Sequence, residues 1–181
     1  MQVYPPQEDS FLLETEILKI DLENKSCLDM GTGSGVQASA MIKKNAKEIT
    51  CADLNYKALL ASEKRNHEFK ERIRFIETNL FSSLKDEVFD FIAFNPPYLP
   101  SDDMKFKDLD GGKKGREITD KFIKALPKHM HQKSVCYLLI SSLNQEDEVL
   151  SLLDKVGLVG FSINRLKLFF EELIVLKIAK A

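Results

Sequence analysis

LDMGTGSG, residues 28–35, sets the architecture of this chain because it joins a strand-like run to a helical pattern through three glycines. The strand-like run covers residues 26–30, and residues 36–44 have the spacing of a helix that packs back on that strand. Glycines at such a junction let the backbone approach a ligand closely. The segment therefore predicts an α/β fold with a nucleotide-like ligand at the carboxyl end of its first strand.

The spacing of the glycines limits which nucleotide-like ligands the loop can bind. A dinucleotide site has the pattern G-x-G-x-x-G, whereas the residue three places after Gly33 is Val36, and the third glycine, Gly35, comes one place early. No lysine follows the glycines, so the group that neutralises a triphosphate in a P-loop is missing from this position. The spacing speaks against both NAD binding and ATP hydrolysis.

Two acids complete the predicted binding site. Asp29 stands directly before the first glycine and suits a positively charged amino group, and Asp53, at the end of the second expected strand, suits ribose hydroxyls. S-adenosylmethionine carries both groups, so it is the predicted cofactor. Asn79, at the end of the third expected strand, is placed to face the adenine ring, although an asparagine there also suits a turn. The alternative for the whole segment is a tight turn in which Asp29 caps a helix.

Strand-like runs alternate with amphipathic helical patterns along the chain, which is typical of a parallel sheet with helices on both faces. The last two runs, 158–163 and 173–178, have no helix between them and predict an antiparallel hairpin at the sheet edge. We expect one domain over residues 1–181, with a Rossmann-like, seven-stranded, mostly parallel sheet. The other expected strands are 26–30, 49–52, 73–77, 89–94 and 135–140, and the expected helices are 36–44, 56–69, 117–130 and 145–156.

The overall composition limits the classes of partner. The net charge is -2 and the pI is about 6.0, so the chain as a whole is not attracted to nucleic acid or to an anionic membrane. The sequence has no basic start followed by an apolar stretch, and no run approaches the roughly 18 apolar residues of a membrane span. We expect a cytoplasmic protein, with a nuclear location as the alternative.

The cysteines and histidines do not predict a metal centre. The three cysteines lie inside apolar runs without a CxxC pattern, so we expect reduced core thiols. The three histidines fall on or just after expected helices, with no carboxylate or cysteine placed to build a triad or metal site. These residues are Cys27, Cys51, Cys136, His67, His129 and His131.

A second motif, Asn95-Pro96-Pro97-Tyr98, follows the fourth expected strand, at the sheet edge where open α/β folds bind ligands. The prolines fix the backbone, so their carbonyls and the Asn95 side-chain oxygen can point rigidly at an incoming NH₂ group. Tyr98 offers an aromatic face for a planar group. The alternative is a proline turn that simply ends a strand, with Tyr98 in the core.

The acceptors of Asn95-Pro96-Pro97-Tyr98 would form a clamp around an NH₂ group. The chemistry of such a clamp indicates methyl transfer to a planar, conjugated nitrogen. The lone pair of an amide or aromatic amine is delocalised, and two acceptors that hold its hydrogens bias the nitrogen toward tetrahedral geometry. Because a sulfonium methyl donor is cationic and the acceptor is neutral, charge disperses in the transition state and no strong base is needed first. Alignment then accounts for most of the catalysis.

The connection over residues 99–115 has no regular period, and a connection of this length in a compact domain is usually functional. Its lysines and aspartates balance, so it is not a basic clamp. Three glycines could act as hinges that order over substrate, or give solvated flexibility: Gly111, Gly112 and Gly115.

The combination of DMGTGSG, Asp53 and NPPY resembles the class I methyltransferases, specifically the HemK-like glutamine methyltransferases of translation release factors. The start, YPPQEDSFLL (residues 4–13), resembles the segment that closes over the cofactor in the archaeal and eukaryotic branch. The resemblance implies a class I S-adenosylmethionine-dependent methyltransferase fold and methylation of the glutamine in the GGQ loop of a class I release factor. It implies a substrate clamp at residues 95–98. The cofactor contacts implied by the resemblance and the glycine loop are Ser10, Asp29, Gly31, Gly33, Asp53, Asn79, Leu80 and Asn95.

The chain departs from the family at Asn79, where an acid is usual. The amide keeps an oxygen for the adenine amine but loses the charge, so we expect weaker cofactor binding and not a lost site. The resemblance also implies a heterodimer with a small zinc-binding activator protein near the third strand. Residues 73–77 should form a bare edge strand that invites pairing, although the charges of Arg72, Arg74 and Glu77 could instead protect it.

Three other functions remain open at this point. NPPY also occurs in enzymes that methylate adenine, so an adenine-specific DNA or RNA methyltransferase is one alternative, and a protein lysine methyltransferase is another. The third is a noncatalytic scaffold, which the intact NPPY disfavours. Only the start of the chain favours glutamine.

Overall fold

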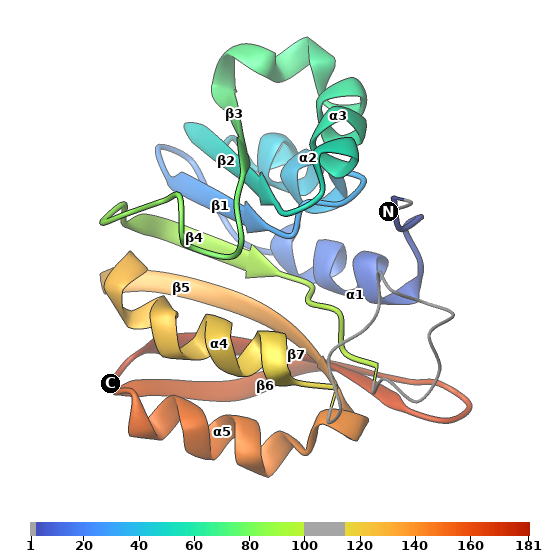
Figure 1. Cartoon of the computed structure of the whole chain (residues 1–181), viewed down its shortest axis with the longest axis vertical. Coiled ribbons are helices and arrows are strands. Elements are labelled where there is room, and N and C mark those ends of the chain that lie inside the picture. Colours follow the sequence, from blue (N-terminus) through green and yellow to red (C-terminus); the bar gives the residue numbers. More distant parts are fainter. Residues whose placement is uncertain (1–2, 100–114) are drawn as a thin grey trace.

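The computed structural model describes residues 3–99 and 115–181, and these residues form a seven-stranded sheet in the order β3-β2-β1-β4-β5-β7-β6 (Figure 1). β1 to β5 run parallel, and β7 pairs antiparallel with both β5 and β6. This confirms the predicted mixed sheet with its C-terminal hairpin. The order reverses between β1 and β4, which is where such sheets bind ligands. The strands are β1 (Ser26–Met30), β2 (Glu48–Asp53), β3 (Ile73–Glu77), β4 (Phe89–Phe94), β5 (Met130–Ser141), β6 (Leu158–Lys167) and β7 (Glu172–Lys180).

Helices cover both faces of the sheet, and Figure 1 shows α4 and α5 on the face opposite α1 and α2. Each face has its own core cluster of buried aliphatic and aromatic side chains. Within the described ranges, no helix is both long and apolar enough to cross a membrane. The helices are α1 (Glu8–Ile17), α2 (Val36–Lys43), α3 (Tyr56–Arg65), α4 (Glu117–Ala125) and α5 (Glu146–Lys155), with short 3₁₀ turns η1 (His67–Arg72), η2 (Leu126–His129) and η3 (Ser142–Asn144).

The helix predicted over residues 56–69 is shorter in the structure, because it ends at Arg65, with Asn66 as its C-cap, and is followed by η1. The buried Asn66 amide donates to the carbonyls of Gly35 (3.2 Å) and Ser62 (3.0 Å). An asparagine side chain that bonds the backbone in this way competes with continued helix. Leu60 and Phe69, which match a helical apolar face, are exposed.

The helix predicted over residues 117–130 is also too long. Pro127 has no N–H to donate, and the chain passes at that point into η2 and then into β5, which begins at Met130. The sequence interpretation assigned no helix to residues 8–17, where the structure has α1. α1 buries Leu12, Leu13 and Ile17, so its stability comes from packing more than from a strong local pattern.

The structure changes the interpretation of one histidine. Contrary to the prediction, His131 has a carboxylate partner, because its Nε2 lies 3.0 Å from Asp90 Oδ1. Asp90 Oδ2 also accepts from the N–H of Ser26 at 2.9 Å. Asp90 stands near the start of β4, at the end of the strand away from the NPPY turn, so this pair joins strand ends far from the predicted chemistry. The three cysteines are free and buried, as predicted.

Candidate active site

A cavity of about 330 Å³ opens at the carboxyl ends of β1 to β4, within the size range of small-molecule sites. Both predicted motifs contribute to its wall, which confirms that the sheet brings the glycine loop and the NPPY turn together. Among the described residues that line the cavity there is no lysine or arginine. Of the predicted site residues, those that line it are Ser10, Gly31, Gly33, Asp53, Asn79, Leu80, Asn95, Pro96 and Pro97.

The first and the last of the three loop glycines pack against different elements. At Gly31 the backbone is left-handed (φ +63°), and a Cβ would come within 3.1 Å of the Phe94 ring. At Gly35 a Cβ would lie 2.5 Å from Ser62 Oγ on α3. The first position therefore fits the loop against β4 at the cavity, whereas the last fits it against α3.

Asp29 lies behind the loop and is not part of the cavity wall. Its Oδ2 accepts from Thr32 Oγ1 (2.6 Å) and from the N–H of Ala38 (3.1 Å), so it ties the loop to the start of α2. Its Oδ1 is buried and has no hydrogen-bond partner in the described part of the chain. Burial raises the pKa of Asp29 to about 7, against the lowering effect of those two hydrogen bonds. The structure thus places this predicted cofactor contact one layer deeper than expected.

Asp53 does line the cavity, at the end of β2. Its Oδ2 accepts from the N–H of Gly33 at 3.0 Å, and its Oδ1 accepts from the N–H of Asn55 at 2.8 Å. The carboxylate therefore joins the second strand to the glycine loop. Its further lone pairs leave it able to accept from a hydroxyl.

The turn after β3 supplies Asn79 and Leu80 to the wall. Asn79 is exposed, and Leu80 is a non-glycine residue in the left-handed region (φ +51°). This conformation costs about 1–2 kcal/mol for a leucine. The buried Thr78 opposes that cost, because its Oγ1 donates to the Leu80 carbonyl (3.0 Å) and accepts from the N–H of Ser83 (3.0 Å).

Asn95 is held by a residue that the sequence interpretation missed. Its Nδ2 donates to Asp9 Oδ2 at 3.1 Å, and Asp9 comes from the first turn of α1. Its Oδ1 is buried and without a partner among the described residues. Pro96 and Pro97 continue the wall beside it. The turn thus presents a buried carbonyl-type oxygen next to a cavity.

Tyr98 differs from its predicted role. It is 6% exposed and belongs to the core cluster on the α1 face, so its ring is not on the cavity wall and does not offer a platform to a substrate in this conformation. Its hydroxyl donates to Asp9 Oδ2 at 3.4 Å. Burial and the Asp9 charge raise the pKa of Tyr98. Its carbonyl accepts from Asn144 Nδ2 at 2.8 Å, and the same Nδ2 donates to the carbonyl of Gly115 at 2.8 Å.

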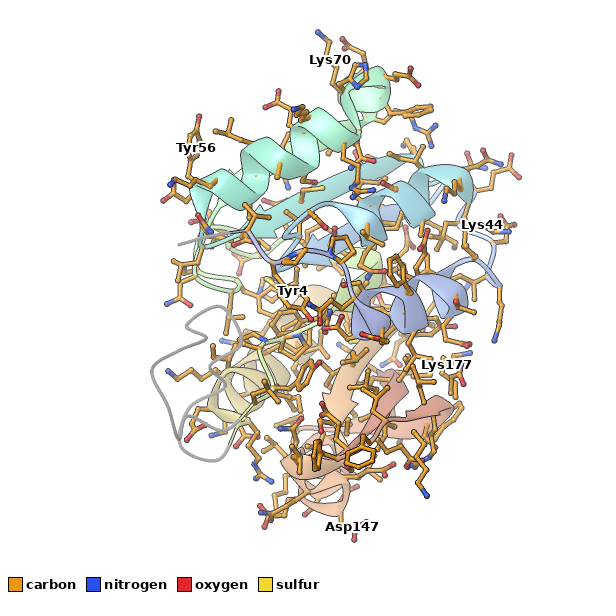
Figure 2. The ribbon with its side chains drawn as sticks, turned by 90° about the vertical axis from the view of Figure 1, so that its right-hand side faces the viewer. Tyr4, Lys44, Tyr56, Lys70, Asp147 and Lys177 are labelled. Carbon is orange, nitrogen blue, oxygen red and sulfur yellow. The ribbon has the colours of Figure 1, made fainter. Side chains whose placement is uncertain are left out.

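The segment before β1 contributes more of the site than expected. Val3, Tyr4, Asp9 and Ser10 all line the cavity. In Figure 2, Tyr4 lies near the middle of the molecule beside α1, whereas Tyr56 projects outward from α3. Burial, followed by the Asp9 charge, raises the pKa of Tyr4. The resemblance of the segment YPPQEDSFLL to the family indicated that this part of the chain contributes to the site, but only Ser10 was predicted from it as a contact.

Gln37, on the first turn of α2, was also missed. Its Nε2 donates to the Ser10 carbonyl at 3.0 Å, and its Oε1 is buried without a partner in the described residues. With Asp29 Oδ1 and Asn95 Oδ1, this gives three buried acceptors around the loop and the turn that lack a donor in the part of the chain that the structure describes. Such a set fits ligands that carry N–H groups or positive charge.

The other predicted features fall outside this cavity or outside the described residues. Predicted hinges Gly111 and Gly112 lie in 100–114, which the structure does not describe. β3 is an edge strand of the described sheet, as predicted. Arg74 on β3 donates to Thr50 Oγ1 at 3.0 Å and pairs with Glu87, so its charge is engaged within its own chain.

The sheet order, with its antiparallel β7 and a cavity at the switch point, is that of a class I methyltransferase fold, as the family match and the structural comparison show. Residues 9–156 match the methyltransferase small domain family, and the chain belongs to that family. A Methanocaldococcus jannaschii protein named for protein N5-glutamine methyltransferase activity is 40% identical, over 97% of this chain and 90% of that protein. Human methyltransferase HEMK2 is 30% identical, over 99% of this chain and 90% of the human protein.

A solved structure is similar over its whole length. It is a chain of the E. cuniculi Mtq2–Trm112 complex, which is described as responsible for the methylation of the translation termination factor eRF1. The TM-score is 0.80 with 29% identity, and the match covers 100% of each chain. The resemblance found in the sequence to HemK-like enzymes is therefore confirmed.

Proposed function

We propose that this methyltransferase transfers the methyl group of S-adenosylmethionine to the side-chain amide nitrogen of the glutamine in the GGQ loop of a class I release factor. The observation that carries the proposal is the buried Asn95 Oδ1, an acceptor that finds no donor among residues 3–99 and 115–181 and stands beside two rigid prolines at the cavity. A primary amide offers N–H donors to such an acceptor. The names of the relatives, which refer to glutamine and to eRF1, support the same substrate.

The cavity suits S-adenosylmethionine. Gln37, in the cavity wall, has an Oε1 without a partner among the described residues that can accept from an ammonium group, and Asp53 can accept from ribose hydroxyls. Asp29 lies one layer behind the wall, where its carboxyl would favour a positive charge on the ligand. Asn79 and Leu80 would contact the adenine ring of the cofactor. Gly31 and Ser10 would contact the rest of the cofactor molecule. When bound, this cofactor supplies a methyl group on a positively charged sulfur. The lack of lysine and arginine in the described wall favours a cationic ligand over a phosphate-bearing one.

The residues of the NPPY turn would act on the acceptor amide. Asn95 Oδ1 and the Pro96 carbonyl accept its two N–H groups, which turns the nitrogen lone pair out of conjugation toward the methyl donor. The fixed φ of Pro96 and Pro97 keeps these acceptors from relaxing during the reaction. As the N–C bond formed, the bond between the methyl group and the cofactor sulfur would break and leave a neutral thioether. The amide nitrogen would become positively charged and lose one proton to solvent, so no base is required beforehand.

The open edge of strand β3 is the proposed contact site for a partner protein. β3 pairs only with β2 within the described sheet, so its outer edge is open to another chain. The similar structure is a complex of Mtq2 with Trm112. We infer that a small activator protein, zinc-binding in the family resemblance, pairs here, and that the enzyme acts in the cytoplasm with the translation machinery.

The test is methyl transfer with methyl-tritiated S-adenosylmethionine, with and without a co-expressed activator. The acceptors are a class I release factor, the same factor with the GGQ glutamine replaced by alanine, DNA and RNA. Label on the first acceptor alone supports the proposal. Label on nucleic acid, or equal label on both release factors, refutes it in favour of an adenine or lysine methyltransferase.

A further inference from the structure

The Asn95 amide has two orientations of nearly equal shape, and only one of them is useful to an amide substrate. With Oδ1 toward the cavity, Asn95 accepts from the substrate's NH₂ group. With Nδ2 toward the cavity, Asn95 presents N–H donors to the substrate's NH₂ group, which is also a donor. Nothing in the proline turn itself distinguishes the two, because prolines restrict the backbone and not the Asn95 side chain. Some other group has to set the orientation.

The neighbour that meets Asn95 is Asp9. Its Oδ2 lies 3.1 Å from Asn95 Nδ2, and Asp9 itself is 2% exposed. A carboxylate only accepts hydrogen bonds, so it pairs with the NH₂ end of the amide and repels the oxygen end. The other end of the amide, Oδ1, is then the one left without a partner among the residues that the structure describes.

Asp9 is in turn surrounded by donors. Its Oδ1 accepts from the N–H (2.6 Å) and the Oγ (3.2 Å) of Ser10, and its Oδ2 also accepts from the Tyr98 hydroxyl at 3.4 Å. Each of these contacts favours an acceptor at position 9. The first turn of a helix, where Asp9 stands, favours negative charge as well.

The backbone also fixes where Asp9 lies. Leu12 and Leu13, three and four positions further along α1, are buried in the core cluster on that face. This places Asp9, at the start of α1, against Asn95, directly after β4, although the two residues are 86 positions apart in the chain. A buried helix thus delivers one carboxylate to the clamp.

We propose that Asp9 is a positioning residue that sets the polarity of the Asn95 amide, and thereby makes the clamp specific for an acceptor nitrogen that still carries hydrogens. The inference rests on the proposed function, in which Asn95 contacts the substrate. Asp9 acts through Asn95 and not on the reacting atoms.

The first test is a double-mutant cycle with the full-length enzyme and the acceptor that the wild type methylates. Asp9→Asn is nearly isosteric but its amide both donates and accepts, so Asn95 populates both orientations and kcat falls about tenfold. The KM for the acceptor and the Kd for S-adenosylmethionine change less than about twofold. In the Asn95→Ala background, Asp9→Asn has no further effect on kcat. Losses that multiply, or a loss confined to KM or to cofactor Kd, overturn the proposal, since Asp9 then acts independently of Asn95.

The control is Glu14→Gln, which removes one charge from the same helix. Glu14 pairs with Lys43 on α2 at 3.2 Å and does not line the cavity, so kcat stays at the wild-type value. If Glu14→Gln lowers kcat as much as Asp9→Asn does, the effect belongs to the helix charge and the proposal fails.

The second test does not depend on the substrate. In ¹⁵N-labelled protein, the Asn95 NH₂ signals, assigned with Asn95→Ala, should exchange slowly with solvent because they are buried against Asp9. Exchange becomes faster in Asp9→Ala, while the fold, monitored by the backbone amide spectrum, is retained. Unchanged exchange in Asp9→Ala contradicts the proposal. A wild type without activity on the release factor would remove the proposed function, and this measurement would still decide the role of Asp9.

Discussion

The glycine loop after β1 and the NPPY turn after β4 line one cavity, but they differ in how far away in the sequence their hydrogen-bond partners lie. The bonds that hold the loop come from residues within 31 positions, on α2, α3 and the end of β2. The turn depends on Asp9, 86 positions away, and on Asn144, 46 positions away. The loop is therefore largely a product of its own neighbourhood, whereas the turn is oriented by elements that arrive from both ends of the chain. Cofactor binding and catalysis should respond separately to mutation.

The pH dependence of stability tests the loop. The unfolded Asp29 carboxyl ionises near 3.8 and the folded one near 7, so the folded state holds an extra proton between these values. The stability that this group contributes is fully present below about pH 4 and is lost as the pH rises through 7, by about 4 kcal/mol. Asp29→Asn should remove that dependence in urea unfolding without cofactor. Parallel pH curves for the two proteins would contradict the assignment.

Replacing Asn95 tests the turn. Asn95→Ala should lower kcat/KM for the release factor at least about hundredfold, or about 2.7 kcal/mol of transition-state stabilisation. The Kd for S-adenosylmethionine, measured by calorimetry, should change much less, because the loop holds the cofactor. An equal loss in both quantities would show that the two parts are not separable.

Substitutions at two loop glycines separate the cost of a steric clash from the cost of a left-handed backbone conformation. Gly35→Ala places a Cβ 2.5 Å from Ser62 Oγ in addition to the left-handed φ of +79°, and should destabilise folding by about 2–3 kcal/mol. Gly33→Ala meets its nearest atom at 3.8 Å, so only the φ of +51° is costly, about 1 kcal/mol. Thermal unfolding of both variants measures the difference. Equal melting temperatures would mean that α3 yields to the extra methyl group.

Asn144 tests the remote support of the turn. Asn144→Ala leaves the Tyr98 and Gly115 carbonyls without their donor, which should cost about 1–2 kcal/mol of stability. Because Tyr98 follows the clamp directly, kcat should fall several-fold while cofactor affinity is kept. A variant with reduced stability but full kcat would show that the clamp keeps its geometry without Asn144.

The smallest effect is expected at Asn79, on the cofactor side. Asn79→Asp introduces the acid that the family resemblance implies at this position, and should tighten S-adenosylmethionine binding by about threefold to tenfold through a charge-assisted hydrogen bond. Direct titration with the cofactor measures it. Weaker binding in Asn79→Asp would place Asn79 away from the adenine amine.

The presence of the seven strands, their mainly parallel arrangement and the two motifs were predictable because each depends on local pattern, although β5 begins five residues before its predicted start and β6 ends four residues after its predicted end. Alternation of strands and helices indicated a parallel sheet, and the missing helix between residues 163 and 173 indicated the hairpin. Helix ends were less predictable, since Asn66 and Pro127 stop their helices through contacts and missing donors that periodicity does not register. The helix at residues 8–17 was missed because its stability comes from packing.

Sequence alone determined which residues could do chemistry: a glycine loop with acids before and after it, and NPPY at the end of a strand. Tertiary structure decided how they are used. It moved Asp29 behind the loop and Tyr98 into the core, and it brought Asp9 to Asn95 across 86 positions. Spacing along a chain specifies local backbone geometry, but the orientation of a side-chain amide depends on which donors and acceptors fold around it.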